Sequence, residues 1–352
     1  MYRECISCDD ILLVPRYSEI KSRNDCDISV DRYSIPLLAS CMDTVYSLEM
    51  DDFLTKKNIM VMVHRYFSDY KEQLNSSPGF STDYRFYAVG SILNDKGKKW
   101  INGLLDAGIK HFVVDMAHGD SKACVETTRY LCSKGSDIKV IAGNVAVKSG
   151  FRRLQDAGAW AIRCGIGSGS ICSTRTKTGF GVPLLASVED CAAQKMGSYL
   201  IADGGVKYSG DIAKVISFGA DFVMSGRMWA ATDLAPGNCH DSDGKFLCKY
   251  NEIDNYFNSS DSSNRELTRY KLYRGMASKE ARQGVLKDSS IEGVSGLIPY
   301  VGKTEDFVKD LSNNLRASLS YAGAYNWKNF KMNAKKILIS DSAWSESQTF
   351  VK

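Results

Sequence analysis

The sequence lacks both a strong excess of charge and a long apolar run. Its 352 residues carry 45 Lys and Arg against 41 Asp and Glu, which gives a formal net charge of +4. A chain so evenly charged offers no electrostatic argument for a nucleic-acid partner. Its apolar runs also fall short of the ~18 residues that a membrane-spanning helix needs. We therefore expect no nucleic acid and no membrane among its partners.

The sequence also lacks the features of a secreted or a zinc-binding protein. The first residues, MYRECISCDD, contain no apolar core of a signal peptide. We therefore expect a cytoplasmic protein whose 11 cysteines are reduced. Cys5 and Cys8 form one CxxC pair, but no second pair has the spacing of metal ligands. A zinc site is not expected.

A regular alternation of elements fills most of the chain. Apolar, β-rich runs recur at residues 35–40, 59–64, 86–91, 111–117, 139–144, 161–165, 199–203 and 221–225. Most segments between them have the apolar spacing of helices. Continuous apolar strands that alternate with helices favour a parallel sheet covered on both faces. Eight such units predict an α/β fold, a single-domain (β/α)8 TIM barrel; an open doubly wound sheet is the alternative from the pattern alone.

The rest of the chain is assigned around this barrel, which we place at residues 1–330. A polar insertion rich in Asn, Asp and Ser lies at about 238–269 and is expected to be a hairpin or a disordered loop. Apolar residues at helical spacing predict a further helix over 305–323. The polar residues 331–352 are expected to form a C-terminal tail without a chemical role.

Polar residues follow several of the predicted strands. The fourth, fifth, seventh and eighth strands end in DMAHGDS, AGN, ADGG and MSGR. Active sites of such barrels lie at the carboxyl ends of the strands, so these residues should converge. Phosphate sites often follow strands seven and eight, where Gly204, Gly205, Gly226 and Arg227 lie. Ordinary turn geometry is the alternative explanation for each glycine.

The sixth strand leads into a Gly- and Ser-rich loop, RCGIGSGSICSTRTKTGFGVP, at residues 163–183. Successive backbone N–H groups in such a loop can cradle an anion. Cys172 follows the glycines and lies near Arg175 and Lys177 in the sequence. Positive surroundings favour the thiolate, so the loop predicts a nucleophilic cysteine beside an oxyanion or phosphate site. The alternative is a buried cysteine that only packs.

This loop resembles the active-site loop of the IMP dehydrogenase/GMP reductase family. The resemblance is carried by GSGSICSTR and TGFGVP, and other matches follow in chain order from about Asp9 to Gly323. It implies a TIM barrel, usually a homotetramer, that binds a purine nucleoside monophosphate and forms a covalent purine adduct on Cys172. No CBS module interrupts the short stretch after the second strand, as in GMP reductases and a few dehydrogenases.

The resemblance also implies roles for individual residues. Asp203 matches the aspartate that binds the ribose diol, Tyr273 matches a tyrosine that touches the phosphate, and Arg227 stands where small residues are usual. The implied substrate-binding residues are Ser170, Asp203, Gly204, Gly205, Gly226, Arg227, Tyr273, Gly275, Met276, Ser278 and Asn144. Asp115 and His118 match the cofactor side. The carbonyls of Gly167 and Gly169 with Cys172 match a potassium site of the dehydrogenases.

The two reactions of the family differ in their proton-transfer groups. A dehydrogenase oxidises IMP with NAD and hydrolyses the adduct to XMP, with a mobile Arg–Tyr flap that activates water. Here ARQGVLKDSSI, residues 281–291, contains Arg282 but no Arg–Tyr pair. Thr174 and Glu292 match the proton relay of GMP reductases, which release ammonia and use NADPH. We therefore favour a GMP reductase with Cys172, Thr174 and Glu292 as catalytic residues.

Two alternatives stay open. AATDLAPG, YRGM and EGVSG resemble dehydrogenases, and an Arg–Tyr pair does occur, at Arg269 and Tyr270, although before the expected position of the flap. An IMP dehydrogenase without CBS domains is therefore the first alternative. A purine nucleotide-binding barrel without turnover is the second, although such a protein has no reason to keep the three catalytic residues together.

Overall fold

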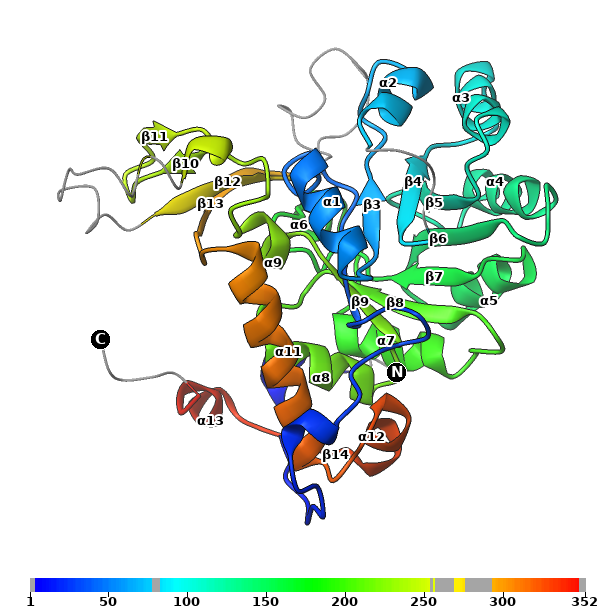
Figure 1. The fold of residues 1–352 in the computed structure, drawn as a ribbon. Helices are drawn as coiled ribbons and strands as arrows, with labels where there is room; N and C mark the ends of the chain where they lie inside the picture. Colours follow the sequence, from blue (N-terminus) through cyan, green and yellow to red (C-terminus); the bar gives the residue numbers. More distant parts are fainter. Residues whose placement is uncertain (1–3, 78–82, 254–255, 257–268, 276–292, 348–352) are drawn as a thin grey trace.

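The computed structural model describes residues 4–77, 83–253, 256, 269–275 and 293–347. The eight expected strands form one parallel sheet that curls into a barrel (Figure 1). They are β2 (Leu37–Ala39), β3 (Val61–Val63), β4 (Arg85–Val89), β5 (His111–Asp115), β6 (Lys139–Val145), β7 (Ala161–Cys164), β8 (Tyr199–Asp203) and β9 (Phe222–Ser225). The sheet order is β2-β9-β8-β7-β6-β5-β4-β3, and the Ala39 N–H donates to Met60 O, 3.4 Å away, where the two end strands meet. The predicted (β/α)8 barrel is confirmed.

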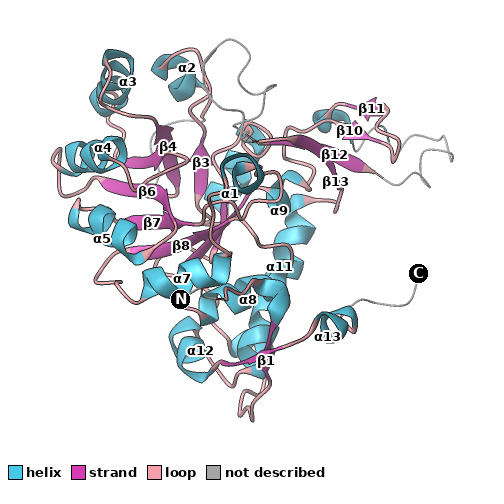
Figure 2. Cartoon of the chain, turned by 180° about the vertical axis from the view of Figure 1, so that it is seen from behind, coloured by secondary structure: helices cyan, strands magenta, loops and turns pink. Residues whose placement is uncertain are grey.

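Helices cover the outside of the barrel, as Figure 2 shows from behind. They are α1 (Leu48–Lys56), α2 (Tyr70–Asn75), α3 (Asp95–Asp106), α4 (Lys122–Cys132), α5 (Lys148–Asp156), α7 (Leu184–Ala192), α8 (Ser209–Ser217) and α11 (Thr304–Tyr321). Side-chain caps begin several of them; the Asn94 Oδ1 atom, for example, accepts the Gly97 N–H at 2.8 Å. The helix expected over 305–323 is α11.

The strands divide their side chains between two hydrophobic clusters. Alternate residues point to opposite faces of a strand. Leu38, Val113 and Ala161 belong to a cluster inside the barrel, whereas their neighbours on the same strands pack against the helices. Burial on both faces explains why the strands appear in the sequence as continuous apolar runs.

Two smaller sheets adjoin the barrel. In the first, β1 (Ile11–Val14) pairs antiparallel with β14 (Lys335–Leu338). Two further helices flank β14, α12 (Trp327–Asn333) and α13 (Asp341–Ser345). The segment expected as a tail therefore contains a strand that pairs with the amino-terminal part of the chain. The sequence could not give this pairing, because an exposed strand has no apolar signature of its partner.

The second small sheet has the order β11-β10-β12-β13. Its strands are β10 (Cys239–His240), β11 (Phe246–Cys248), β12 (Tyr270–Arg274) and β13 (Ser295–Pro299). β10 and β11 form an antiparallel hairpin at the beginning of the expected insertion.

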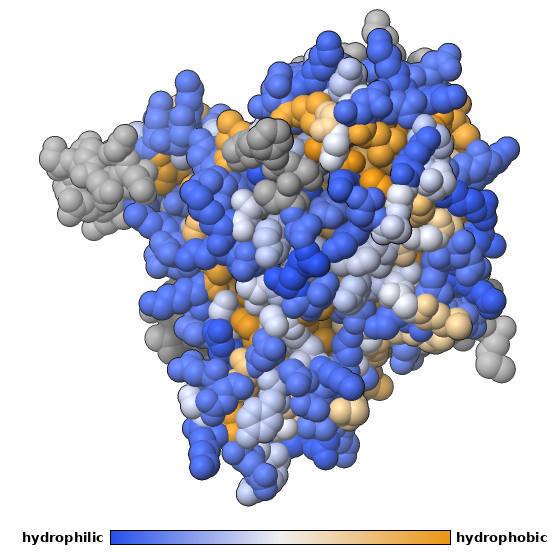
Figure 3. Space-filling model, turned by 45° about the vertical axis from the view of Figure 1, so that its right-hand side comes forward, coloured by the Kyte–Doolittle hydropathy of each residue, from blue (hydrophilic) through white to orange (hydrophobic). Residues whose placement is uncertain are grey.

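All of the cysteines are free thiols, and none of the helices in the described ranges is long and apolar enough to cross a membrane. The face drawn in Figure 3 is mostly hydrophilic.

One fully buried ion pair supports the barrel from outside. The Arg85 Nε atom, at the start of β4, lies 2.7 Å from the Asp51 Oδ2 atom on α1, and their side chains are 2% and 0% exposed. The Tyr46 hydroxyl donates to the same carboxylate oxygen at 2.8 Å. Removal of one partner would leave a charge buried without compensation.

We therefore predict that Arg85→Met lowers the free energy of unfolding by about 3–5 kcal/mol. The matched control is Lys56→Met, which breaks an exposed pair with Asp52 on the same helix. It should cost less than about 1 kcal/mol. Urea unfolding followed by circular dichroism measures both. Equal losses in the two variants would show that the buried pair does not support the fold in this way.

Candidate active site

Three charged side chains stand at the carboxyl end of the barrel interior. Asp115, Arg163 and Asp203 each lie two residues beyond an inward-facing apolar residue of β5, β7 and β8. They therefore continue the inner face of the barrel to its rim. Asp115 and Asp203 belong to the polar ends of the fourth and seventh predicted strands, which are expected to converge, and Arg163 lies between them.

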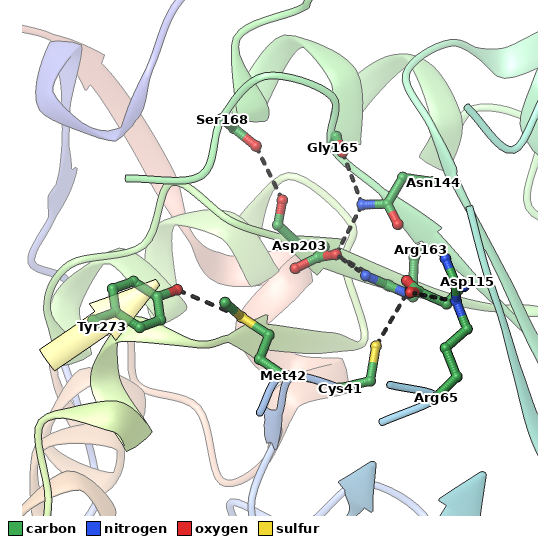
Figure 4. Close-up of polar contacts among 10 residues, drawn as sticks. All are labelled: Cys41, Met42, Arg65, Asp115, Asn144, Arg163, Gly165, Ser168, Asp203 and Tyr273. Carbon is green, nitrogen blue, oxygen red and sulfur yellow. Dashed lines mark hydrogen bonds and ion pairs between the residues drawn. The ribbon is translucent and has the colours of Figure 1, made fainter. Parts of the chain in front are cut away.

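Arg163 bridges the two carboxylates (Figure 4). Its Nη1 atom lies 2.7 Å from the Asp115 Oδ1 atom, and its Nη2 atom lies 2.7 Å from the Asp203 Oδ2 atom. Burial opposes ionisation of both Asp115 and Arg163 and is the largest single effect, but the neighbouring opposite charges and hydrogen bonds together outweigh it. The pKa of Asp115 is therefore lowered from its ordinary value. The pKa of Arg163 is raised well above the ordinary value of an arginine, and Asp203 is the charge that raises it most. The cluster remains ionised in spite of its burial.

A glycine makes this bridge possible. In the sheet register, Asp115 pairs with Gly143 and Gly143 pairs with Arg163, so the glycine lies between the two charged residues. A Cβ atom on Gly143 would lie 2.7 Å from the Arg163 Cβ atom. A larger residue would therefore push the arginine out of its place in the barrel mouth.

Arg65 and Cys41 complete the bridge. The sequence predicts no role for these two residues or for Arg163. The Arg65 Nε atom lies 3.4 Å from the Asp115 Oδ2 atom. The Arg163 Nη1 atom lies 3.7 Å from the Cys41 Sγ atom, and burial raises the pKa of that thiol to about 12, so it stays protonated. A usable signal existed for Arg163 alone, because it is a charged residue within a buried strand, and such charges are paired.

Asn144 connects the bridge to the cysteine loop. Its Nδ2 atom donates to the Asp203 Oδ2 atom at 2.8 Å and to the Gly165 carbonyl at 2.9 Å. Arg163 and Asn144 thus both contact Oδ2 of Asp203. Within the described ranges no protein donor reaches Oδ1, so this oxygen is left to accept a bond from a ligand.

The loops after β7 and β8 lie against each other. The Ser168 hydroxyl donates to the Asp203 carbonyl at 3.0 Å. Gly204 and Gly205 follow directly, and the Gly204 N–H donates to Met224 O at 3.3 Å. The expected phosphate-binding glycines therefore lie beside the cysteine loop, with Ser170 exposed further along it.

Tyr273 closes the other side of the expected phosphate site. Its side chain is buried, and its hydroxyl lies 3.7 Å from the Met42 Sδ atom. A Cβ atom on Gly226 would lie 2.4 Å from this hydroxyl, so a side chain here would displace the tyrosine. Burial and Asp203 raise the pKa of Tyr273, and Arg227 opposes them. Arg227 begins the short helix α9 (Arg227–Ala230), and its side chain makes no hydrogen bond within the described part of the chain.

Cys172 lies exposed on the loop, and its Sγ atom is 3.1 Å from the Thr174 Oγ1 atom. Thr174 begins the short helix α6 (Thr174–Thr178). The Cys172 N–H donates to Gly169 O at 3.1 Å, which fixes the turn before the thiol. Arg175 donates from Nη2 to Val182 O at 2.9 Å, so its guanidinium ties the two ends of the loop. This contact with the backbone is its role in the structure.

The second small sheet reaches the cysteine loop. The Val294 N–H donates to Ile171 O at 3.1 Å, and the Gly275 N–H donates to Val294 O at 3.0 Å. Cys172 also forms an isolated β-bridge with Gly293. Gly275 therefore lies beside the cysteine loop.

The remaining expected residues fall in two groups. His118 is exposed beyond the end of β5, near Asp120, whereas Asp115 points into the barrel mouth. Met276, Ser278 and Glu292 lie outside the described residues.

Comparison with known proteins agrees with this geometry. Residues 5–350 match the family model of the IMP dehydrogenase / GMP reductase domain. The chain is 32% identical over 330 residues to a GMP reductase from Lactobacillus gasseri, and the alignment covers 91% of both proteins. It is 37% identical over 277 residues to an inosine-5'-monophosphate dehydrogenase from Nitrosopumilus maritimus, which covers 74% of this chain but only 53% of that relative.

A third relative is also matched over only about half of its length. An inosine-5'-monophosphate dehydrogenase from Aquifex aeolicus is 36% identical over 259 residues, which span 48% of its length. The chain thus spans about half of the dehydrogenases it matches and nearly all of the reductase. With the barrel, the exposed Cys172 and the charged barrel mouth, these matches show that the chain belongs to the IMP dehydrogenase/GMP reductase family.

Proposed function

We propose that this protein is a GMP reductase, which converts GMP to IMP and ammonia with NADPH. The observation that carries the proposal is the 3.1 Å contact between the Cys172 Sγ atom and the Thr174 hydroxyl. It places a proton-transfer group directly beside the nucleophile, which suits a reaction that must protonate a departing amine. The match to a GMP reductase along 91% of both chains supports the same choice.

The nucleotide would bind across the loops after β7, β8 and β9. Gly204, Gly205, Gly226, Arg227 and Tyr273 would surround the 5′-phosphate, together with Ser170. The free Oδ1 atom of Asp203 would accept a hydrogen bond from the ribose diol, while Arg163 and Asn144 hold Oδ2. Asn144, Gly275, Met276 and Ser278 would face the purine. This pose brings purine C2 to Cys172.

The chemistry follows in two stages. The Cys172 thiolate adds to C2, the bond from C2 to the exocyclic nitrogen breaks, and this nitrogen leaves as ammonia after it takes a proton from Thr174. Glu292 would return that proton to Thr174. Hydride addition at C2 then lets the bond from C2 to Sγ break, which releases IMP and restores the thiolate. The sum is GMP, NADPH and two protons to IMP, NADP⁺ and ammonium.

The chemistry of the donor set at the cofactor side fits a nicotinamide nucleotide. The Asp115 side chain is 18% exposed and offers a carboxylate to a ribose hydroxyl, and exposed His118 offers a ring nitrogen at the rim. NADPH, when bound, supplies the hydride. NAD would take this place in a dehydrogenase. Arg163 and Arg65 would keep the Asp115 carboxylate ionised and oriented toward the bound cofactor.

Potassium and a homotetramer are part of the same proposal. The carbonyl oxygens of Gly167 and Gly169, with Cys172, are the expected cation ligands. The Gly169 carbonyl accepts one N–H, from Cys172, and a carbonyl oxygen has a second lone pair for a cation.

An IMP dehydrogenase is the second candidate, because the identity to the Nitrosopumilus maritimus dehydrogenase, 37%, is higher over its shorter alignment.

The first prediction from the proposed function concerns the direction of the reaction. The purified protein should oxidise NADPH in the presence of GMP and should not reduce NAD in the presence of IMP, as followed by nicotinamide absorbance. Cys172→Ala should remove the activity and keep nucleotide binding, because only the nucleophile is lost. NAD reduction with IMP alone would overturn the reductase proposal in favour of the dehydrogenase.

The second prediction tests the proton-transfer group. Thr174→Val should lower kcat by roughly 10²-fold with little change in the KM for GMP, because general acid catalysis typically contributes that much. Thr176→Val is the matched control on the same helix, since its hydroxyl donates only to Ser173 O and should not affect the rate. Similar rates for both variants would remove Thr174 from the mechanism.

The third prediction uses the exposure of the thiols. Brief iodoacetamide treatment near neutral pH should label the exposed Cys172 and Cys5, whereas Cys41, with its pKa raised to about 12 by burial, should stay unlabelled. GMP at ten times its Kd should slow labelling of Cys172 roughly ten-fold by occupancy, with Cys5 as the internal control. Mass spectrometry of the peptides gives both rates. Equal protection of both thiols would contradict a nucleotide site at Cys172.

A further inference from the structure

A buried lysine lies outside the site described above and makes an unusual set of contacts. Lys271 is on β12, and its side chain is fully buried. Its Nζ atom lies 2.6 Å from Ala235 O, 2.9 Å from Thr232 O and 3.5 Å from Asp233 O. An ammonium has three N–H donors, so these carbonyls use all of them. Among the described residues no carboxylate oxygen lies within ion-pair distance of it.

The three carbonyls belong to one short segment, residues 232–235, which follows α9. Other contacts hold this segment in place. The Thr304 hydroxyl, at the start of α11, donates to the Asp233 Oδ1 atom at 2.7 Å. The Ser47 hydroxyl, at the start of α1, donates to Leu234 O at 2.7 Å. Lys271 therefore connects β12 to a segment that is itself fixed to the barrel.

The same strand carries the tyrosine of the expected phosphate site. Lys271 and Tyr273 are two residues apart, and both are buried on one face of β12. The Tyr273 hydroxyl lies over Gly226, immediately before α9, and the Lys271 ammonium contacts the segment that follows α9. Figures 1 and 2 show β12 next to α9. The two side chains of β12 thus contact the chain on both sides of α9, Tyr273 before this helix and Lys271 after it.

A merely space-filling role does not account for these contacts. An apolar side chain would fill the same volume without the cost of burying an ammonium. What the ammonium adds is a directional link to several carbonyls at once, which fixes how closely β12 approaches the loop after β9. The Tyr273 hydroxyl depends on that closeness, because it lies against the Met42 sulfur and the Gly226 backbone of the barrel loops.

We propose that Lys271 is a positioning residue for the substrate 5′-phosphate, which acts by holding the Tyr273 hydroxyl against the loop after β9. The proposal rests on the proposed function, because that function assigns the phosphate to Gly226, Arg227 and Tyr273. It adds that phosphate affinity depends on a lysine that never touches the nucleotide.

The test measures binding by calorimetry, with GMP and with guanosine, which lacks the phosphate. Lys271→Met should weaken GMP binding roughly ten-fold, the amount typical of one hydrogen bond to a charged group, and leave guanosine binding within two-fold of the wild type. The matched control is Lys214→Met. Lys214 is also a buried lysine that donates to a backbone carbonyl, Cys8 O at 2.8 Å, but this contact joins α8 to the amino-terminal part of the chain. It should change neither affinity.

A double-mutant cycle with Tyr273→Phe tests the route of the effect. If Lys271 acts through the tyrosine, the double variant should bind GMP no more weakly than Tyr273→Phe alone. Additive losses would overturn the proposal, and so would equal weakening of GMP and guanosine, which is the result expected if the substitution only loosens the fold.

The wild-type protein offers a second measurement that needs no substitution at a buried site. Burial lowers the pKa of Lys271 to about 8, and the groups that face it, Asp233 and the Cys239 and Cys248 thiols, raise it. The Tyr250 ring also faces the ammonium, at 5.9 Å. As pH rises from 7 to 9 the ammonium loses a proton and one donor, so GMP affinity should fall relative to guanosine affinity.

The ratio of the two affinities cancels titration of the base, and the phosphate is already fully ionised above its pKa of about 6. A ratio that stays constant over this range would count against the proposal.

The binding and turnover measurements also separate this inference from the proposed function. A wild type that prefers GMP to guanosine but turns over no nucleotide would sink the reductase assignment and leave the Lys271 comparison valid. A wild type without that preference would overturn both.

Discussion

The bridge from Arg163 to Asp115 and Asp203 is the constraint on which the site depends. A charge in the interior of a barrel is tolerated only if it is paired with good geometry. The pairing requires β5, β7 and β8 to end at the same level of the barrel. It also requires Gly143, which lies between Asp115 and Arg163 in the sheet, to leave room for the arginine side chain. With the bridge formed, Arg163 holds one oxygen of each aspartate, and Arg65 contacts the second oxygen of Asp115. The mouth of the barrel thereby becomes a rigid polar surface on top of an apolar interior.

This arrangement separates binding from chemistry. The aspartates and Asn144 are held by strands of the barrel, which are fixed by packing on both faces. Cys172 and Thr174 lie instead on an exposed loop, beside each other because they are two residues apart. The loop is joined to the second small sheet through Ile171 and Val294. A base held by packing, with an exposed cysteine loop above it, suits the proposed reaction, in which a covalent adduct forms on Cys172 and breaks again.

The second small sheet has a structural role that its peripheral position does not reveal. β12 brings Tyr273 to the loop after β9, and Lys271 ties the same strand to the segment beyond α9. The chain returns from the polar insertion directly into this strand. The insertion therefore adjoins the expected phosphate site through β10 and β12, which pair antiparallel.

The barrel, the positions of its strands and the helix predicted over 305–323 follow from the sequence alone, because buried elements leave apolar residues at a regular spacing. The sequence also places Cys172 and Thr174 two residues apart, so the contact between them is local. The tertiary structure was needed to find the partners of Arg163, which lie 48 and 40 residues away, and the pairing of β1 with β14. It alone revealed the carbonyl contacts of Lys271. Such contacts depend on strand register and on which segments the barrel brings together, and neither leaves a periodic signal in the chain.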